Sequence, residues 1–163
     1  MEFQHELVIP DEGLPFKFFL FEGSQGNYVR EKHWHTSIEI FAVMEGSLTF
    51  YLNDEKHPLK AGELMIINSN EVHSIDSPEE NHTAVLQIPL KQFEDYFTAH
   101  RFIRFAANEQ ETDSQLWRLI REMYKLYGKR GTGYEFKIRS FYYDVLYPVS
   151  YTHLRAHETL SDL

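Results

Sequence analysis

The sequence predicts a mainly β fold, an all-β sandwich or barrel in its first half, followed by two or three α-helices. Two observations indicate this. Between Pro15 and Leu90, short apolar and aromatic runs alternate with turn signals, a spacing typical of a sandwich or barrel. After Pro89 the apolar period changes from two residues towards 3.6, the helical repeat. With 163 residues, 42% of them hydrophobic, the chain is long enough for one domain with a real core.

The expected strands are the apolar runs between turns. Residues 16–21 form an aromatic run suited to a strand. Residues 37–44 and 47–52 flank Glu45 and Gly46, so we expect a β-hairpin with a turn there, and Gly46 is able to take positive φ. The remaining expected elements are a turn at 53–56 and strands at 64–67 and 83–88.

The helices follow from amphipathic stripes. Leu90, Phe93, Tyr96 and Phe97 share one face of a short helix. Residues 112–115 have the form of a capping box and start a helix that ends at Gly128, and residues 131–133 separate it from another. The two stripes are Leu116, Leu119, Ile120, Met123 and Tyr127, then Tyr134, Ile138, Phe141, Tyr142 and Val145. Such a pair either covers its own sheet or pairs with a second copy of the chain.

Composition and charge exclude several classes of protein. The formal net charge of -9 repels phosphate backbones, which argues against nucleic-acid binding by this chain itself. The absence of cysteine excludes disulfide frameworks and cysteine-type zinc sites. No run approaches the roughly 18 apolar residues of a membrane span, and the start of the chain is acidic where a signal peptide is basic. We therefore expect a cytoplasmic location.

The last residues read differently from the rest of the chain. Residues 149–159 resemble one reading frame of a transposase adapter used in sequencing-library preparation. We interpret 148–163 as a non-native tail and assign no function to His153 or His157. The expected organisation is then a β-barrel with an N-terminal arm at 1–90, a helical dimerisation region at 91–147 and the tail at 148–163.

One polar cluster carries the chemistry. In an extended strand, residues two apart face the same side, so His33, His35 and Glu39 are expected to point one way, together with Phe41 and Val43. Buried polar groups among apolar ones must be paired, metal-bound or in contact with a ligand. A further imidazole, His73, follows the apolar run 64–67. Three imidazoles and a carboxylate suit a divalent ion such as Zn, Fe, Mn or Ni.

These spacings resemble two known motifs. His33-x-His35-x3-Glu39-x6-Gly46 resembles the first cupin motif, and Gly62 followed by residues 68–73 resembles the second. Asn68, Asn70 and Ser77 depart from the second motif, which usually has proline, glycine and asparagine there, but none of them removes a ligand position. The sequence in and around both motifs is similar to that of the N-terminal sensor domain of AraC-type transcriptional regulators, over roughly residues 10–147.

The resemblance implies a cupin-like double-stranded β-barrel, or jelly roll, that binds a small effector, often a sugar or related metabolite, followed by helices that dimerise. In that family a C-terminal domain with two helix-turn-helix units binds DNA, and this chain contains no such basic region. The expected function is therefore effector sensing and homodimerisation through residues 112–147, with DNA bound only through the absent domain and no catalysis by the chain itself.

Alternatives stay open at the cluster. His33, His35, Glu39 and His73 could hold a metal, could contact a polar effector directly with Phe41 stacking on it, or could form a structural polar cluster. The rival function is a stand-alone metal-dependent cupin enzyme, an isomerase or a dioxygenase. A purely structural dimerisation module is a third reading.

Overall fold

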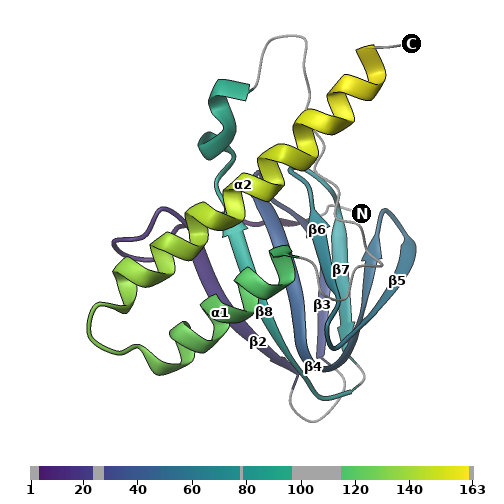
Figure 1. The fold of residues 1–163 in the computed structure, drawn as a ribbon. Coiled ribbons are helices and arrows are strands. Elements are labelled where there is room, and N and C mark those ends of the chain that lie inside the picture. Colours follow the sequence, from purple (N-terminus) through teal and green to yellow (C-terminus); the bar gives the residue numbers. More distant parts are fainter. Residues whose placement is uncertain (1–3, 24–27, 78, 97–114, 162–163) are drawn as a thin grey trace.

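The computed structural model describes residues 4–23, 28–77, 79–96 and 115–161. Strands come first along the chain and helices last, as the sequence predicts (Figure 1). The strands are β1 (Gln4–His5), β2 (Lys17–Gly23), β3 (Tyr28–Trp34), β4 (Ile38–Leu52), β5 (Glu55–Lys60), β6 (Leu64–Ile67), β7 (His73–Ser77) and β8 (Asn81–Ile88). A 3-10 helix (Leu90–Tyr96), α1 (Gln115–Lys129) and α2 (Tyr134–Ser161) follow.

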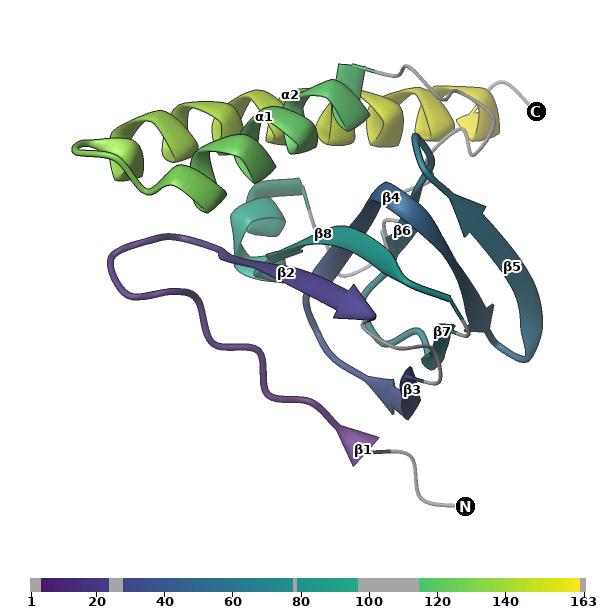
Figure 2. The same cartoon turned by 90° about the horizontal axis from the view of Figure 1, so that it is seen from below.

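The strands form one curled sheet in the order β1-β3-β7-β4-β8-β2, with β5 and β6 also paired to β4. Its pairs are antiparallel except for β1 with β3. Viewed from below, the sheet wraps around an interior, and the two long helices cover one outer side (Figure 2). The predicted mainly β fold class, a cupin-type barrel with C-terminal helices, is confirmed.

The predicted hairpin turn at Glu45 and Gly46 is wrong, because β4 continues through both residues for 15 residues in all. The residues before Glu45 pair with β6 and β8, and the residues after Gly46 pair with β5 and β7. The register shifts between Val43 and Glu45, and Gly46 has φ +73°, so this point is a bulge at which one strand passes from one half of the sheet to the other. The positive φ was predicted; its structural role was not.

The tight turn lies further along, at Asn53 and Asp54, inside the predicted turn 53–56. Both residues have positive φ, 50° and 69°, and Leu52 pairs directly with Glu55. Two left-handed residues between paired strands form the two-residue hairpin that matches the strand twist. Asn and Asp tolerate this conformation better than most side chains, so the local sequence explains the turn.

Two apolar cores lie on the two faces of β4. Ile38, Ile40 and Ala42 belong to the core between sheet and helices, which we call the outer core. Phe41 and Val43 belong to the core inside the curl, the inner core, and Glu39 is 2% exposed on the same side. The strand therefore buries both faces, which explains why its sequence is almost continuously apolar.

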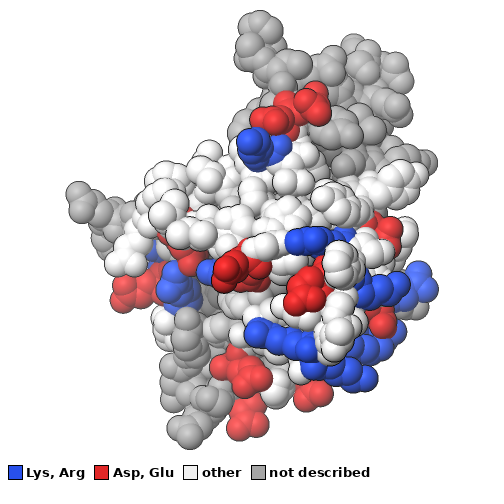
Figure 3. Space-filling view, turned by 90° about the vertical axis from the view of Figure 1, so that its left-hand side faces the viewer, with Lys and Arg blue, Asp and Glu red and all other residues white. Residues whose placement is uncertain are grey.

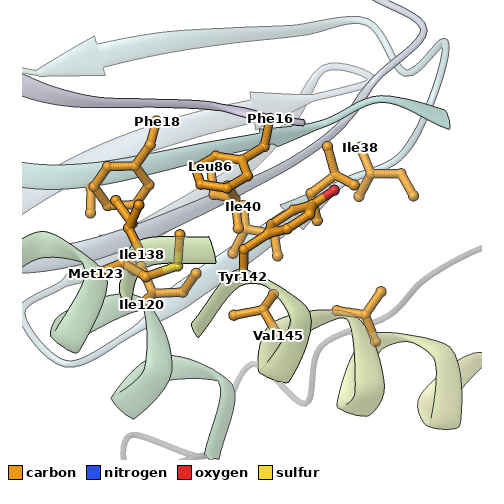
Figure 4. Packing of buried hydrophobic residues seen from close by; sticks show 14 of the residues in the cluster. Phe16, Phe18, Ile38, Ile40, Leu86, Ile120, Met123, Ile138, Tyr142 and Val145 are labelled. Atoms are coloured by element: carbon orange, nitrogen blue, oxygen red, sulfur yellow. The ribbon is translucent and has the colours of Figure 1, made fainter. Parts of the chain in front are cut away.

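The helices cover their own sheet, one of the two arrangements expected for them. Ile120 and Met123 of α1, with Ile138, Tyr142 and Val145 of α2, are fully buried in the outer core (Figure 4). The turn at 131–133 lies between the helices as predicted. The predicted short helix is the 3-10 helix Leu90–Tyr96; its expected member Phe97 and residues 112–114 of the capping box lie outside the described residues.

Helix α2 continues past residue 147 to Ser161, and Val149 is 2% exposed in the outer core. The interpretation of 148–163 as a non-native tail stays a prediction. Within the described part of the chain, no helix combines the length and apolar character that a membrane crossing requires.

Candidate functional site

Four of the predicted site residues meet at one end of the barrel, which we call the mouth. His33 lies near the end of β3, His35 in the connection after it, Glu39 on β4 and His73 at the start of β7. The ring centroids of His33 and His73 are 4.2 Å apart, and those of His35 and His73 are 5.0 Å apart. All four side chains are buried, with exposed fractions of 1–5%.

The predicted route to this cluster is partly wrong. His33, His35 and Glu39 do not alternate along one strand, because β3 ends at Trp34 and β4 begins at Ile38. The turn between β3 and β4 brings the two histidines to Glu39. Asn70 stabilises this turn by donating its backbone N–H to the carbonyl oxygen of His35. The parity prediction holds only within β4, where Glu39, Phe41 and Val43 face inward.

Each of the three histidines is held by its own local backbone. The Nδ1 atoms of His33, His35 and His73 lie 2.9, 2.9 and 3.0 Å from the carbonyls of Glu31, Ser37 and Glu71. A carbonyl only accepts, so every Nδ1 carries the proton and donates it. In the neutral ring, Nε2 then carries a lone pair, which is the form a metal ligand or a hydrogen-bond acceptor requires.

Glu39 is the centre of the cluster. Its Oε2 lies 2.9 Å from Nε2 of His35 and 3.2 Å from Nε2 of His73. Its Oε1 accepts a hydrogen bond of 2.7 Å from Nε2 of Gln87. The carboxylate is therefore fixed by three side chains from β7, β8 and the turn before β4.

These contacts shift the pKa values. Burial would raise the pKa of Glu39, but the hydrogen bonds from His35 and His73 outweigh it and lower the pKa to about 2. Burial would lower the pKa of His35, but the hydrogen bond and charge of Glu39 leave it raised above 6.5. Burial and the neighbouring His73 lower the pKa of His33. The cluster thus holds an ionised carboxylate beside one histidine that favours its charged form and one that favours its neutral form.

Some buried polar atoms at the mouth lack a hydrogen-bond partner among the described residues. They are Oε1 of Gln87 and Oγ of Ser69. A buried polar atom without a partner costs stability, so such atoms are rare in structural clusters. Oε1 of Gln87 is such an atom, in the side chain whose amide nitrogen donates to Glu39.

The N-terminal arm reaches the cluster. The arm pairs with β3 through β1 as an edge strand, and Glu6 donates its backbone N–H to the carbonyl of Trp34. The carboxylate of Glu6 lies 3.4 Å from Nε2 of His33 and 3.3 Å from Arg30. Beside the cluster, a cavity of about 240 Å³ is lined by Lys32, Tyr51, Asn53, Asp54, Val72 and His73.

The structure differs from the sequence-based expectation at two residues: Phe41 was predicted in the site and lies in the core, and Gln87 was not predicted and lies in the site. Phe41, predicted to stack on an effector, is buried in the inner core with its ring edge-on to Phe50, and its ligand contact stays a prediction. Gln87 was missed, although a signal existed: in the strand 83–88, Thr83, Val85 and Gln87 alternate with purely apolar residues. An inward glutamine next to an inward carboxylate could have been found by pairing the two strands.

The donor set suits a divalent metal. The ligand atoms of His33, His35 and His73 all lie within 4.8 Å of one another, with Oε2 of Glu39 adjacent. Two nitrogens bound to one ion at about 2.1 Å are about 3.0–3.4 Å apart at the angles of an octahedral or tetrahedral site, so the most distant pair of rings needs to close by up to about 1.8 Å. The residues present therefore fit a metal such as Zn, Fe, Mn or Ni after this movement.

Comparison with known proteins gives one family match. A family model described as AraC-like ligand binding domain matches residues 15–146. A search of curated proteins found no match. On the face shown in Figure 3, lysine and arginine side chains lie beside aspartate and glutamate side chains.

Similar folds occur among solved structures. A cupin superfamily protein from Desulfitobacterium hafniense matches with 10% identity, covering 51% of this chain and 74% of that chain, at a TM-score of 0.45. A predicted oxalate decarboxylase from Thermotoga maritima matches with 25% identity, 47% and 69% coverage and a TM-score of 0.43. Bacillus subtilis oxalate decarboxylase, studied for its Mn(II) centres, matches with 19% identity, 48% and 22% coverage and a TM-score of 0.42. At these TM-scores neither activity nor metal is carried over.

Proposed function

The chain belongs to the AraC-like ligand-binding domain family, and on this premise we propose that it is the effector-sensing and dimerisation domain of a transcriptional regulator. The effector is a small polar metabolite, sugar-like or related, bound at the mouth of the barrel. The observation that carries the proposal is the buried polar mouth, in which Oε1 of Gln87 and Oγ of Ser69 have no hydrogen-bond partner among the described residues. Hydroxyl groups of a ligand supply the missing donors and acceptors.

DNA binding in this proposal belongs to a separate C-terminal domain, as the family resemblance implies. The net charge of -9 gives the sensing domain no attraction for DNA. Effector binding shifts the population of arm and helix arrangements, and so the spacing of the attached DNA-binding domains.

Dimerisation is assigned to the helices. Phe136, Tyr143 and Tyr147 of α2 are 76%, 58% and 70% exposed although the opposite face of the helix is buried. Their spacings of seven and four residues place them on one stripe of the helix. An aromatic stripe of this kind suits a second copy of the same helix, as the family resemblance implies.

The experiment combines calorimetric titration against a panel of sugars and related metabolites with a measurement of molar mass by light scattering. We expect binding of at least one polar metabolite with a Kd on the order of micromolar, and a dimer that Tyr143→Ser with Tyr147→Ser weakens. The double variant Glu135→Gln with Lys137→Gln, on the same helix, is the matched control. No binding by any compound together with a strict monomer at high concentration would overturn the proposal.

A metal-dependent cupin enzyme is the second candidate, and one observation favours it. All three mouth histidines donate Nδ1–H to a backbone carbonyl, which aims their Nε2 atoms into the cluster. His33, His35, His73 and Glu39 would hold the ion, which would supply Lewis-acid chemistry to a bound substrate.

Metal analysis separates the two candidates. If the protein purified without chelators carries less than about a tenth of an equivalent of transition metal, and added Fe, Mn, Zn or Ni does not raise its melting temperature, the enzyme candidate fails. If metal raises the melting temperature, His73→Ala abolishes the effect and His82→Ala, whose ring is half-exposed beside Glu22, retains it.

A further inference from the structure

A lysine shares the inner face of the barrel with the polar cluster. Lys17, the first residue of β2, pairs with Gln87 of β8, and Gln87 pairs with Glu39 of β4. Residues directly opposite each other on neighbouring strands project to the same face of a sheet. Phe19 and Phe21, two and four residues after Lys17, pack against the inner core, whereas Phe16 and Phe18 belong to the outer core. Lys17 therefore lies on the inner side, at the mouth.

The charge of Lys17 is not used by the described part of the protein. Its contact there is with the ring of Phe19, whose centroid lies 5.2 Å from Nζ. Glu39 is not its counter-ion, because Oε1 of that carboxylate accepts from Gln87 and Oε2 faces His35 and His73. The carboxylate of Glu39 instead faces His35, whose Nε2 lies 2.9 Å from Oε2.

Gln87 stands between the lysine and the carboxylate. Its side chain is 1% exposed, and its amide nitrogen is committed to Glu39. Its carbonyl oxygen Oε1 is buried without a hydrogen-bond partner among the described residues. An unmatched cation and an unmatched acceptor thus come from directly paired positions on β2 and β8, which lie side by side in Figures 1 and 2.

We propose that Lys17 and Gln87 form an anion-binding subsite at the barrel mouth, and that the effector is a small hydroxy-carboxylate such as a sugar acid. The carboxylate of the ligand pairs with Nζ of Lys17, and a neighbouring hydroxyl donates to Oε1 of Gln87. Phe19 supplies an apolar surface beside the lysine. This inference rests on the proposed sensing function and narrows its ligand class from polar metabolites to acids.

The overall charge of the chain makes a local cation necessary for such a ligand. With a net charge of -9, an acidic protein repels an anionic ligand unless a local cation compensates. A lysine on the inner face, next to the cluster around Glu39, supplies that compensation.

The test uses pairs of probes that differ in one group. D-glucuronate and D-galacturonate are compared with D-glucose and D-galactose, and L-lactate with L-lactamide, by calorimetric titration of the full chain at neutral pH. We expect at least one acid to bind about tenfold or more tightly than its neutral partner, and its affinity to fall as ionic strength rises. Acids and neutral partners that bind equally well would overturn the subsite.

Substitutions test whether Lys17 is responsible for the preference for acids. Lys17→Met is expected to lower the affinity for the acid by about tenfold or more, with Lys17→Arg retaining most of it. Lys60→Met, at an exposed lysine of β5, is the matched control and should leave the affinity unchanged. If Lys17→Met does not fold, the preference of the wild-type chain for acids and its salt dependence still decide the question. Unchanged affinity in a folded Lys17→Met would refute the assignment.

The outcomes separate this inference from the proposed function. Binding of neutral sugars without binding of any acid leaves the sensing function standing and removes the anion subsite. Binding of neither class removes both.

Discussion

The two ends of the barrel bury polar side chains in different ways. At the mouth, buried atoms of Gln87 and Ser69 have no hydrogen-bond partner among the described residues. At the opposite end, the base, Ser77, Asn81 and Thr83 are equally buried, with exposed fractions of 0–2%. Strand β8 runs from Asn81 at the base to Gln87 at the mouth, so the two clusters share one element.

The base is a closed chain of hydrogen bonds. Thr83 Oγ1 donates to Oδ1 of Asn81 at 2.8 Å, Asn81 Nδ2 donates to Oγ of Ser77 at 2.5 Å, and Ser77 Oγ donates to the carbonyl of Glu79 at 2.9 Å. Every donor has an acceptor inside the protein, which is what a structural cluster requires. Burial of polar groups alone therefore does not mark a functional site, and the mouth differs from the base in that its set of hydrogen-bond partners is incomplete among the described residues.

The largest expected effect is at the edge of the base. Gly46→Ala places a Cβ in collision with the backbone oxygen of Glu80, at a residue with φ +73°. We expect a loss of about 3 kcal/mol or more in the free energy of unfolding, because neither the backbone nor the conformation can adjust cheaply. Urea denaturation measures it.

The control for this change is Gly128→Ala, at the end of α1, where a Cβ meets nothing within 4 Å. There alanine should leave stability unchanged or raise it by up to about 1 kcal/mol. Equal behaviour of the two variants would show that the bulge does not constrain the fold.

The second prediction compares the loss of stability at a buried side chain that makes hydrogen bonds with that at one that makes none among the described residues. Asn81→Ala removes two buried hydrogen bonds at the base and should cost about 2 kcal/mol. Ser69→Ala removes a buried hydroxyl at the mouth whose Oγ has no partner among the described residues, and should be neutral or stabilising. Thermal melts of both variants measure the two changes in stability. A loss of stability in Ser69→Ala as large as that in Asn81→Ala would contradict the prediction.

The third prediction concerns pH. Since the pKa of Glu39 falls from 4.5 to about 2 on folding, its stabilisation is present above pH 4.5 and is lost as pH falls towards 2. Since the pKa of His35 is raised above 6.5, its stabilisation is present below pH 6.5 and is lost as pH rises through the raised value. The pair therefore contributes most between about pH 4.5 and 6.5.

The measurement is the difference in unfolding free energy between the wild type and Glu39→Gln across pH, in buffer with a chelator. Glu122→Gln, which removes an exposed carboxylate paired with Lys125, is the control and should give a small, nearly flat difference. A flat difference for Glu39→Gln would show that its contacts carry no net charge effect.

The smallest effect is expected in the outer core, at Tyr142. Its hydroxyl is buried without a partner among the described residues, as at the mouth, but its neighbours are apolar (Figure 4). Tyr142→Phe should therefore raise stability, by up to about 1 kcal/mol, with no change in ligand binding. Tyr143→Phe, at an exposed ring of the same helix, should change neither. A destabilised Tyr142→Phe would indicate that the hydroxyl has a function.

Sequence patterns predicted the fold class because each helix and most strands carry their own period. The apolar stripes of Ile120 with Met123 and of Ile138 with Val145 face the sheet as expected. The hairpin at Glu45 and Gly46 was predicted wrongly because a glycine with positive φ serves a turn and a bulge equally well. Only the pairing partners of β4, which are distant in the sequence, distinguish the two.

The site was predictable to a similar degree. The residues His33, His35, Glu39 and His73 were identified by spacing and do meet in space, but by a turn and not by alternation along one strand. Gln87 and Lys17 were missed because their importance depends on which strands are neighbours, and spacing within one segment carries no information on that.

The alternation of β4 has a mechanical consequence. Glu39 touches the polar cluster, while Ile38 and Ile40, on either side of it in the sequence, pack in the outer core with Tyr142 and Val145 of α2. Protein cores are too densely packed to absorb a shift of one member without moving its neighbours. A small displacement of β4 at the mouth therefore also moves the residues that pack against α2. The two contacts are one residue apart on the same strand, so no other element is needed to couple them.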